Sequence, residues 1–191
     1  MSDKTNGFIS LGDIAKVFSE VGLLLFPDNC ITFCRPSEIP HGCFSNFYIA
    51  PIRINDLIYP TIEHWYQASK FDDAEWRERI RTCEKPKEAK NLAYSGIEPI
   101  RSDWETIKYA IMKQGLMAKF TQHASLCETL LSTGNKALIE LSKRDQIWGA
   151  RIVKDENGND KLEGQNLLGI SLMEVREEIR HSRGEPFSFV R

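Results

Sequence analysis

The hydrophobic pattern of the chain changes character after Tyr59, and this change constrains its fold. Between Cys30 and Tyr59 the apolar runs are short and typical of strands. One covers Cys30–Arg35, and two more, Ile52–Ile54 and Leu57–Tyr59, flank the turn signal Asn55-Asp56, which predicts a hairpin. After Tyr59 the apolar residues recur mostly at helical spacing. We therefore expect an α+β fold that is rich in helices and carries a small β-sheet or hairpin.

Capping residues and prolines mark where the expected helices begin. Thr61 is placed to cap a helix that runs to about Phe71, Pro86 opens one through Leu92, and Asp103 caps a longer one to about Phe120. The remaining expected helices cover Leu11–Leu25, Leu126–Ser132, Asn135–Ser142 and Leu167–His181. A polar hairpin or loop with DENGND at its tip precedes the last of them.

Length and charge fit one globular domain without a broad nucleic-acid surface. A chain of 191 residues without repeats or low-complexity linkers suits a single domain, which we expect at 28–182 between a helical extension over 1–27 and a tail over 183–191. The 25 Lys and Arg residues are balanced by 27 Asp and Glu, a formal net charge of −2. This balance argues against a protein that coats nucleic acid through bulk positive charge.

The cysteine count and the absence of apolar targeting segments indicate a cytoplasmic protein, or a nuclear one in a eukaryote. Five cysteines are an odd number, which fits reduced thiols better than a disulfide framework. No signal peptide and no membrane-spanning run is evident. A zinc site would have to use Cys30, Cys34, His41 and Cys43 as ligands. We expect none, because their spacing lacks the Cys-x-x-Cys motif that structural zinc sites favour.

The segment YPTIEHWYQASKF carries the clearest functional pattern. In helical phase Glu63, Gln67 and Lys70 fall at i, i+4 and i+7, which places a carboxylate, an amide and an ammonium on one face beside aromatic residues. A second carboxylate, Asp145, precedes Trp148 in a loop that leaves a predicted helix. From spacing alone, a solvated face on a surface helix is the favoured explanation for Glu63, Gln67 and Lys70. Asp145 is explained equally well as a turn or cap residue.

Taken together, the motifs resemble the NADAR family. In order along the chain they are FSNFY, YPTIEHWYQASKF, DW, KF, LLSTGNKALIE, DQIWG and GQNLLG, the last followed by a helix with Met173 and Arg176. The resemblance runs from about Cys34 to Ile179 and includes no departure at the positions that matter most, although Thr61 replaces the usual serine.

The resemblance implies an N-glycosidase that cleaves a C–N bond between ribose and a base nitrogen. The family's essential glutamate matches Glu63, its tryptophan Trp104 and its aspartate Asp145, while Lys70 matches the lysine that ends the Tyr-Gln-x-x-Lys run. Glu63 is expected to act as the acid or base closest to the reacting carbon, with Asp145 ionised and orienting ribose or water. No metal or redox cofactor is implied.

Residue type and motif position suggest how the substrate is bound. Trp104 and Trp148 are candidates to stack on the base or to wall the ribose. We expect hydrogen bonds to ribose from Asn46 and Asn166, and phosphate contacts from Arg35 and the loop Thr133-Gly134. Phe47 and Gln67 complete the expected binding set.

Lys70 leaves two interpretations open. A ribose linked through an amine nitrogen can open to an imine, and a nearby amine can exchange into it as a Schiff base with Glu63 moving the proton. The other interpretation is a lysine that binds phosphate or forms a salt bridge.

Three functions follow from the resemblance. We expect first the removal of ADP-ribose from guanine in nucleic acid, with brief contact to ADP-ribosylated DNA or RNA. The second is hydrolysis of phosphoribosylated aminopyrimidine intermediates of riboflavin biosynthesis. The third is a non-catalytic ADP-ribose-binding module. It is disfavoured because a protein that only binds ADP-ribose does not need both carboxyl groups, Glu63 and Asp145. Neither an obligate protein partner nor a membrane is expected.

Overall fold

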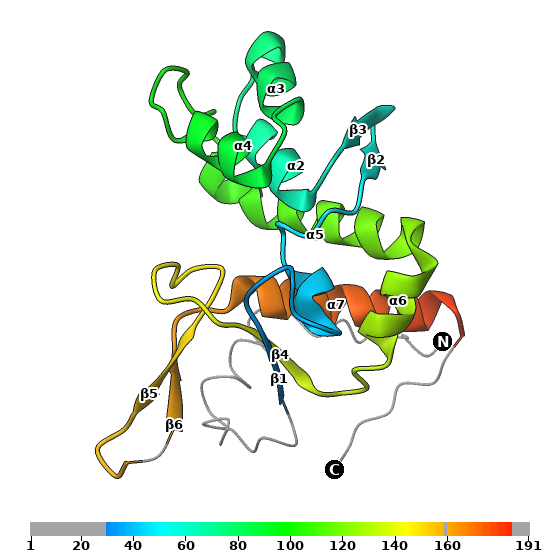
Figure 1. Cartoon of the computed structure of the whole chain (residues 1–191), viewed down its shortest axis with the longest axis vertical. Coiled ribbons are helices and arrows are strands. Elements are labelled where there is room, and N and C mark those ends of the chain that lie inside the picture. Colours follow the sequence, from blue (N-terminus) through cyan, green and yellow to red (C-terminus); the bar gives the residue numbers. More distant parts are fainter. Residues whose placement is uncertain (1–29, 159, 185–191) are drawn as a thin grey trace, which may run out of the picture.

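The computed structural model describes residues 30–158 and 160–184 of the chain (Figure 1). The helix expected at Leu11–Leu25 and most of the expected tail lie outside the described residues. Within them, helices predominate and the strands form three separate two-stranded sheets. The expected helix-rich α+β fold is confirmed.

The hairpin expected around Asn55-Asp56 is present. Strands β2 (Ile52–Ile54) and β3 (Leu57–Tyr59) pair antiparallel, with Ile54 opposite Leu57. Asn55 and Asp56 have φ values of 49° and 62°. Two successive positive φ angles are what the tightest hairpin turns require, and Asn and Asp adopt them at low cost.

Three short helices follow the hairpin and pack against one another, and the first of them also packs against the long helix that crosses the centre of the molecule. They are α2 (Ile62–Ala68), α3 (Ala74–Arg81) and α4 (Pro86–Ala93), and the long helix is α5 (Trp104–Gln122) (Figure 1). Thr61 caps α2 as expected, because its hydroxyl accepts from the His64 N–H. Asp103 stands at the expected start of α5, but its carboxylate is bound to Arg101 instead of the helix N–H groups.

The helix α3 was not expected from the sequence. Its apolar residues are few, and the two that it buries, Trp76 and Ile80, are spaced i, i+4 and pack against α2. Asp73 caps it by accepting from the Trp76 N–H at 2.6 Å. One apolar pair in a charged segment is a weak helical signal, so only contact with α2 explains where this helix lies.

The prediction of a helix at Asn135–Ser142 is wrong, because the segment contains a strand. Strand β4 (Ala137–Glu140) pairs in parallel with β1 (Cys30–Phe33), with Ala137 opposite Cys30. Its first three residues are buried between β1 and α7 (Leu167–Ser182). A short apolar run reads as helix or strand equally well, and the partner strand decides.

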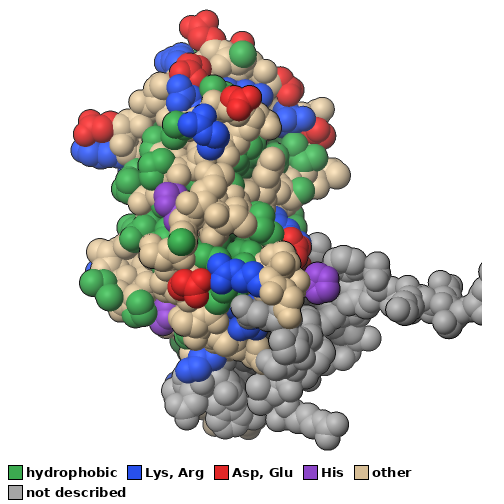
Figure 2. All heavy atoms as spheres, turned by 90° about the vertical axis from the view of Figure 1, so that its right-hand side faces the viewer, with side chains coloured by type: hydrophobic (Ala, Val, Ile, Leu, Met, Phe, Trp, Pro, Cys, Tyr) green, Lys and Arg blue, Asp and Glu red, His purple; other side chains and the backbone are tan. Residues whose placement is uncertain are grey.

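The remaining elements agree with the sequence. Helix α6 (Ala124–Leu131) links α5 to β4, and β5 (Arg151–Lys154) pairs antiparallel with β6 (Asp160–Glu163) in a hairpin that projects from the body (Figure 1). A single 3-10 turn, η1 (His41–Phe44), follows β1. On the face shown in Figure 2, acidic and basic side chains are interspersed, as the near-neutral charge suggests.

The contact between α7 and β4 requires a glycine. A Cβ atom at Gly169 would lie 2.0 Å from the Leu138 carbonyl oxygen and 2.5 Å from Asn166 Nδ2. Neither atom can move freely, because Leu138 belongs to a strand and its oxygen accepts from Asn166 Nδ2 at 2.9 Å. Gly169 therefore sets how closely the first turn of α7 approaches β4.

We expect Gly169→Ala to destabilise the protein by at least about 2 kcal/mol, because the added methyl group overpacks this contact. Urea denaturation of both proteins measures the difference. Gly96→Ala is the control, since a Cβ there meets nothing within 4 Å and only its φ of 74° opposes the change, at a cost of about 1 kcal/mol. Equal stability of the two variants would contradict the argument from close approach.

Candidate active site

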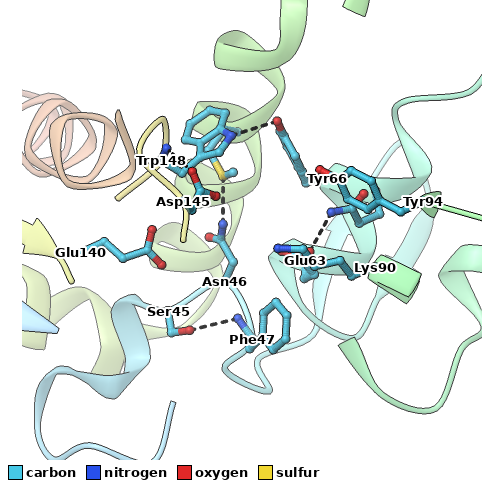
Figure 3. Close-up of a pocket in the computed structure, with 12 residues that line it drawn as sticks. Ser45, Asn46, Phe47, Glu63, Tyr66, Lys90, Tyr94, Glu140, Asp145 and Trp148 are labelled. Atoms are coloured by element: carbon cyan, nitrogen blue, oxygen red, sulfur yellow. Dashed lines mark hydrogen bonds between the residues drawn. The ribbon is translucent and has the colours of Figure 1, made fainter. Parts of the chain in front are cut away.

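One pocket gathers polar side chains from elements that are far apart in the sequence (Figure 3). Its walls come from the segment after η1, from α2, α4 and α5, and from the end of β4 with the loop behind it. The space enclosed by these walls, including the solvent at its open side, is about 470 Å³. The lining residues are Ser45, Asn46, Phe47, Glu63, Tyr66, Gln67, Lys90, Tyr94, Met112, Glu140, Asp145 and Trp148.

Glu63 is the most deeply buried carboxyl of the pocket. It is 4% exposed, and burial raises the pKa of its carboxyl group despite the cations Lys90 and Lys70 nearby. Gln67, one helical turn later, donates from Nε2 to Glu63 Oε1 at 2.7 Å. Oε1 is thereby held as an acceptor, so the proton of the acid form is best placed on Oε2. The arrangement suits a general acid.

Asp145 enters the pocket from the loop between β4 and β5. Its Oδ1 accepts from the backbone N–H groups of Ile147 and Trp148 at 3.0 and 2.9 Å. The Asp145 N–H donates to the Ser142 hydroxyl at 2.9 Å, which anchors the loop on the other side. These bonds fix the carboxylate at the wall of the pocket.

A third carboxyl, Glu140, was not expected from the sequence. It is the last residue of β4 and lines the pocket with Glu63 and Asp145 (Figure 3). Burial raises its pKa to about 7, and the negative charges of Asp145 and Glu63 add to the shift. Because the segment was interpreted as a helix, nothing indicated that this residue ends a strand beside Asp145.

Two amide oxygens that line the pocket have no hydrogen-bond partner among the described residues. They are Asn46 Oδ1 and Gln67 Oε1, and both are buried. The amide nitrogens are engaged, since Gln67 binds Glu63 and Asn46 donates to Met112 Sδ at 3.4 Å. An unpartnered buried acceptor is costly, so both oxygens are suited to donors on a ligand.

Lys70 lies beside the pocket in a cage of aromatic rings rather than in its lining. Its Nζ is 4.0 Å from the ring centroid of Tyr94, 5.6 Å from that of Tyr66 and 5.8 Å from that of Trp104. Burial lowers its pKa to about 8, although Glu63 opposes the shift. At a given pH, a larger fraction of Lys70 is therefore the neutral amine than would be found for an exposed lysine.

The two expected tryptophans occupy different positions. Trp148 lines the pocket and donates from Nε1 to the Tyr66 hydroxyl at 3.1 Å. Trp104 does not line it and packs behind Tyr66, with ring centroids 4.9 Å apart. Trp104 thus shapes the aromatic wall from behind.

The outer part of the pocket combines two aromatic rings with a cation. Phe47 is half-buried, Tyr94 is 65% exposed, and Lys90 Nζ lies 6.0 Å from the centroid of the Phe47 ring. Phe47 was expected from the sequence, whereas Lys90 and Tyr94 carry no motif that would have indicated them.

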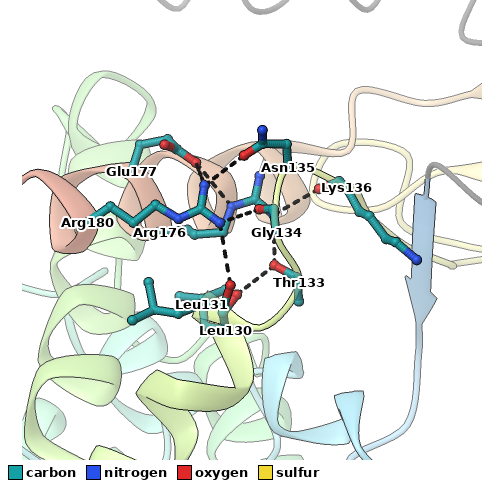
Figure 4. Close-up of polar contacts among 9 residues, drawn as sticks. All are labelled: Leu130, Leu131, Thr133, Gly134, Asn135, Lys136, Arg176, Glu177 and Arg180. Atoms are coloured by element: carbon teal, nitrogen blue, oxygen red, sulfur yellow. Dashed lines mark hydrogen bonds and ion pairs between the residues drawn. The ribbon is translucent and has the colours of Figure 1, made fainter. Parts of the chain in front are cut away.

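The remaining expected binding residues do not line the pocket. Arg35 is exposed on the segment after β1. The loop Thr133-Gly134 is held by α7, because Arg176 Nη1 donates to Thr133 Oγ1 at 2.8 Å and Arg180 Nη2 to the Gly134 carbonyl at 2.6 Å (Figure 4). Asn166 Oδ1 accepts a hydrogen bond from the Glu140 N–H at 3.0 Å, and Asn166 Nδ2 donates to the Leu138 carbonyl oxygen at 2.9 Å. Both ends of the Asn166 amide are therefore bonded to β4.

No metal centre is formed by the side chains described. Within residues 30–158 and 160–184, no three His, Cys, Asp or Glu side chains meet as a metal site would require, and Cys30, Cys34, His41 and Cys43 are no exception. Cys30, Cys34, Cys43 and Cys83 are free thiols. Among the helices described, none has both the length and the apolar character needed to cross a membrane.

The raised pKa of Glu140 predicts a pH-dependent effect of Glu140→Gln. The folded protein holds the proton up to about pH 7 and the unfolded chain releases it near the ordinary value of 4.5, so wild-type stability falls as pH rises between these values. The neutral variant escapes this loss. Relative to wild type, it should gain about 1–3 kcal/mol between pH 4.5 and pH 8, measured by urea denaturation. Glu156→Gln, at an exposed position, should show no such trend.

Comparisons with known proteins identify the family of the chain. Residues 32–180 match the model of the NADAR domain. N-glycosidase YbiA of Shigella flexneri is 40% identical over 152 residues, which cover 80% of this chain and 89% of that protein. The riboflavin biosynthesis protein VVA0006 of Vibrio vulnificus is 37% identical over 150 residues, 78% of this chain and 38% of that protein.

A solved structure gives the same result for the fold. The NMR structure of Escherichia coli YbiA superposes with a TM-score of 0.71 at 36% identity, covering 86% of this chain and 92% of that one. The family match spans most of the chain and includes every residue that lines the pocket. The chain belongs to the NADAR family and is an N-glycosyl hydrolase.

Proposed function

We propose that this N-glycosidase hydrolyses the bond between ribose C1 and an amine nitrogen on an amino-substituted base. The observation that carries the proposal is the excess of acceptors in the pocket: three carboxyl groups and the unpartnered amide oxygens of Asn46 and Gln67. Such a lining suits a ligand rich in hydrogen-bond donors, which ribose hydroxyls and base amino groups supply. It also stabilises positive charge that develops at C1 when the bond breaks.

Glu63 is the general acid of this proposal. Burial raises the pKa of its carboxyl group, which favours the protonated form, and Gln67 donates to one of the two carboxyl oxygens. The proton passes to the leaving nitrogen as the C–N bond breaks, so the base departs as a neutral amine. Asp145, fixed by two backbone N–H groups, takes a proton from the water that attacks C1.

We place a phosphoribosylated aminopyrimidine first as substrate. Its one phosphate matches one lysine, Lys90, in the pocket lining. The Vibrio vulnificus relative is named a riboflavin biosynthesis protein, which supports the same substrate class. This order reverses the one expected from the sequence.

Guanine-linked ADP-ribose is the second candidate. The exposed ring of Tyr94 and the half-buried ring of Phe47 lie at the outer part of the pocket and offer stacking surfaces to a second base. Contact with nucleic acid would then be confined to the modified guanine. The near-neutral charge of the chain is compatible with such brief contact.

Parallel assays test the substrate. The protein is incubated with the phosphoribosylaminopyrimidine and with an ADP-ribosylated guanine oligonucleotide, and released ribose 5-phosphate or ADP-ribose is measured by mass spectrometry. We expect kcat/KM to be at least about tenfold higher for the aminopyrimidine. Faster release of ADP-ribose from the oligonucleotide would make guanine-linked ADP-ribose the preferred substrate. Release of product from neither substrate would overturn the proposal.

In the same assay, Glu63→Gln should lower kcat by about 10²–10⁴-fold, because the amide cannot supply the proton. Binding of ribose 5-phosphate, measured by calorimetry, should change little, since Gln has the shape of Glu. Glu156→Gln, on the projecting hairpin, is the matched control and should keep wild-type kinetics. If Glu63→Gln keeps more than a tenth of the wild-type kcat, Glu63 is not the general acid.

Lys70 offers an alternative to water as the first nucleophile. In a ring-opened ribosylamine, the neutral Lys70 amine adds to C1 of the imine, the base amine leaves with the proton from Glu63, and water then hydrolyses the lysine imine. The pKa of about 8 favours this chemistry. Access requires movement of Tyr94, whose ring covers the Lys70 ammonium and whose side chain is largely exposed.

Reduction during turnover tests the lysine route. With borohydride and substrate, we expect a ribosyl adduct that peptide mapping places on Lys70 and that Lys70→Met lacks. Lys113→Met, which changes a lysine of α5 bound to Glu174 and Glu178, should still form the adduct. Full turnover with no adduct would assign the first attack to water activated by Asp145.

A further inference from the structure

A lysine outside the pocket lining is completely buried. Lys119 of α5 is 0% exposed, and its Nζ makes one hydrogen bond, to the Ser45 carbonyl oxygen at 3.1 Å. Within the described part of the chain no carboxylate lies within ion-pair distance of it. Burial lowers its pKa to about 7, and the nearby thiol of Cys43 opposes the shift. A buried cation without a counterion is costly, and methionine would fill the same space without that cost.

The surroundings of Lys119 belong to a single turn. The Ser45 carbonyl that it binds also accepts the Tyr48 N–H at 3.2 Å, and Ser45 Oγ accepts the Phe47 N–H at 3.3 Å. Lys119 Nζ lies 5.2 Å from the centroid of the Tyr48 ring. The turn Ser45–Tyr48 therefore closes around this ammonium, and its first three residues line the pocket.

The same turn is bonded directly to the backbone of Glu63. The Glu63 N–H donates to the Asn46 carbonyl at 3.1 Å, so Asn46 satisfies an N–H group in the first turn of α2. The side chain of Asn46 is held in addition by Met112, seven residues before Lys119. Residues at i and i+7 share a helix face, so α5 fixes the turn at two points.

We infer that Lys119 is a positioning residue of the active site: its ammonium holds the turn Ser45–Tyr48, and through Asn46 this turn holds Glu63. The inference rests on the proposed role of Glu63. It explains why a costly buried charge is kept in the core, since a methionine there would leave the Ser45 carbonyl with one donor fewer and the turn less fixed. Departures from ordinary core composition concentrate where function requires them.

Lys119→Met tests the inference with the full-length protein. The variant removes the charge and the donor at similar volume. We expect a melting temperature at or above that of wild type, because the desolvation cost disappears, and a kcat/KM at least about tenfold lower, mostly through kcat, because Glu63 is no longer held in line. Lys113→Met is the matched control from the same helix and should keep kcat/KM within about twofold of wild type.

A second variant separates the outcomes. Lys119→Arg keeps a cation and donors and should recover part of the lost kcat. Wild-type kcat in a folded Lys119→Met would overturn the inference and make Lys119 a packing residue. Failure of both Lys119 variants to fold would overturn it too, because the residue would then serve the fold. If Glu63→Gln keeps its activity, the proposed function fails instead, whatever Lys119→Met shows.

Discussion

The burial of α2 on all sides is the constraint on which the rest of the structure depends. Each residue of Ile62–Ala68 is buried, although three of the seven are polar or charged. His64 is satisfied within the protein, since its ring nitrogens lie 2.8 Å from Thr61 Oγ1 and 3.1 Å from the Cys83 carbonyl. Glu63 and Gln67 satisfy only part of each other's capacity, and what remains faces the pocket. A helix that must be enclosed thus supplies the reactive groups.

Local signals explain the parts of the fold that the sequence predicts well. The hairpin at Asn55-Asp56, the cap at Thr61 and the final helix depend on residues close together in the chain. Strand β4 and helix α3 depend on distant partners, β1 and α2, which no local pattern reveals. Because β4 was predicted as a helix, Glu140 at its end was not recognised as a pocket residue, and the predicted site lacked one carboxyl group.

Residue type identified polar side chains without distinguishing a ligand-facing amide from a structural one. Asn46 and Asn166 look alike in the sequence, yet Asn46 lines the pocket with an unpartnered oxygen while Asn166 is bonded to β4 at both ends. The difference lies in the backbone. Asn166 has a φ of 52°, a left-handed conformation that Asn adopts more readily than most residues, whereas Asn46 is not among the residues with positive φ. Only the three-dimensional arrangement decides which amide remains free.

Asn166 nevertheless acts on the site through Glu140. Its hydrogen bond to the Glu140 N–H, with the Ala150 N–H on the Glu140 carbonyl, fixes the end of β4 against the loop that carries Asp145. The packing of α7 thereby holds like charges together, which is why the pKa of Glu140 is raised beyond the effect of burial. Repulsion among these carboxyl groups is relieved when positive charge develops at ribose C1. The fold thus places carboxyl groups that are costly to ionise in the pocket, where the positive charge of the proposed reaction would stabilise their ionised form.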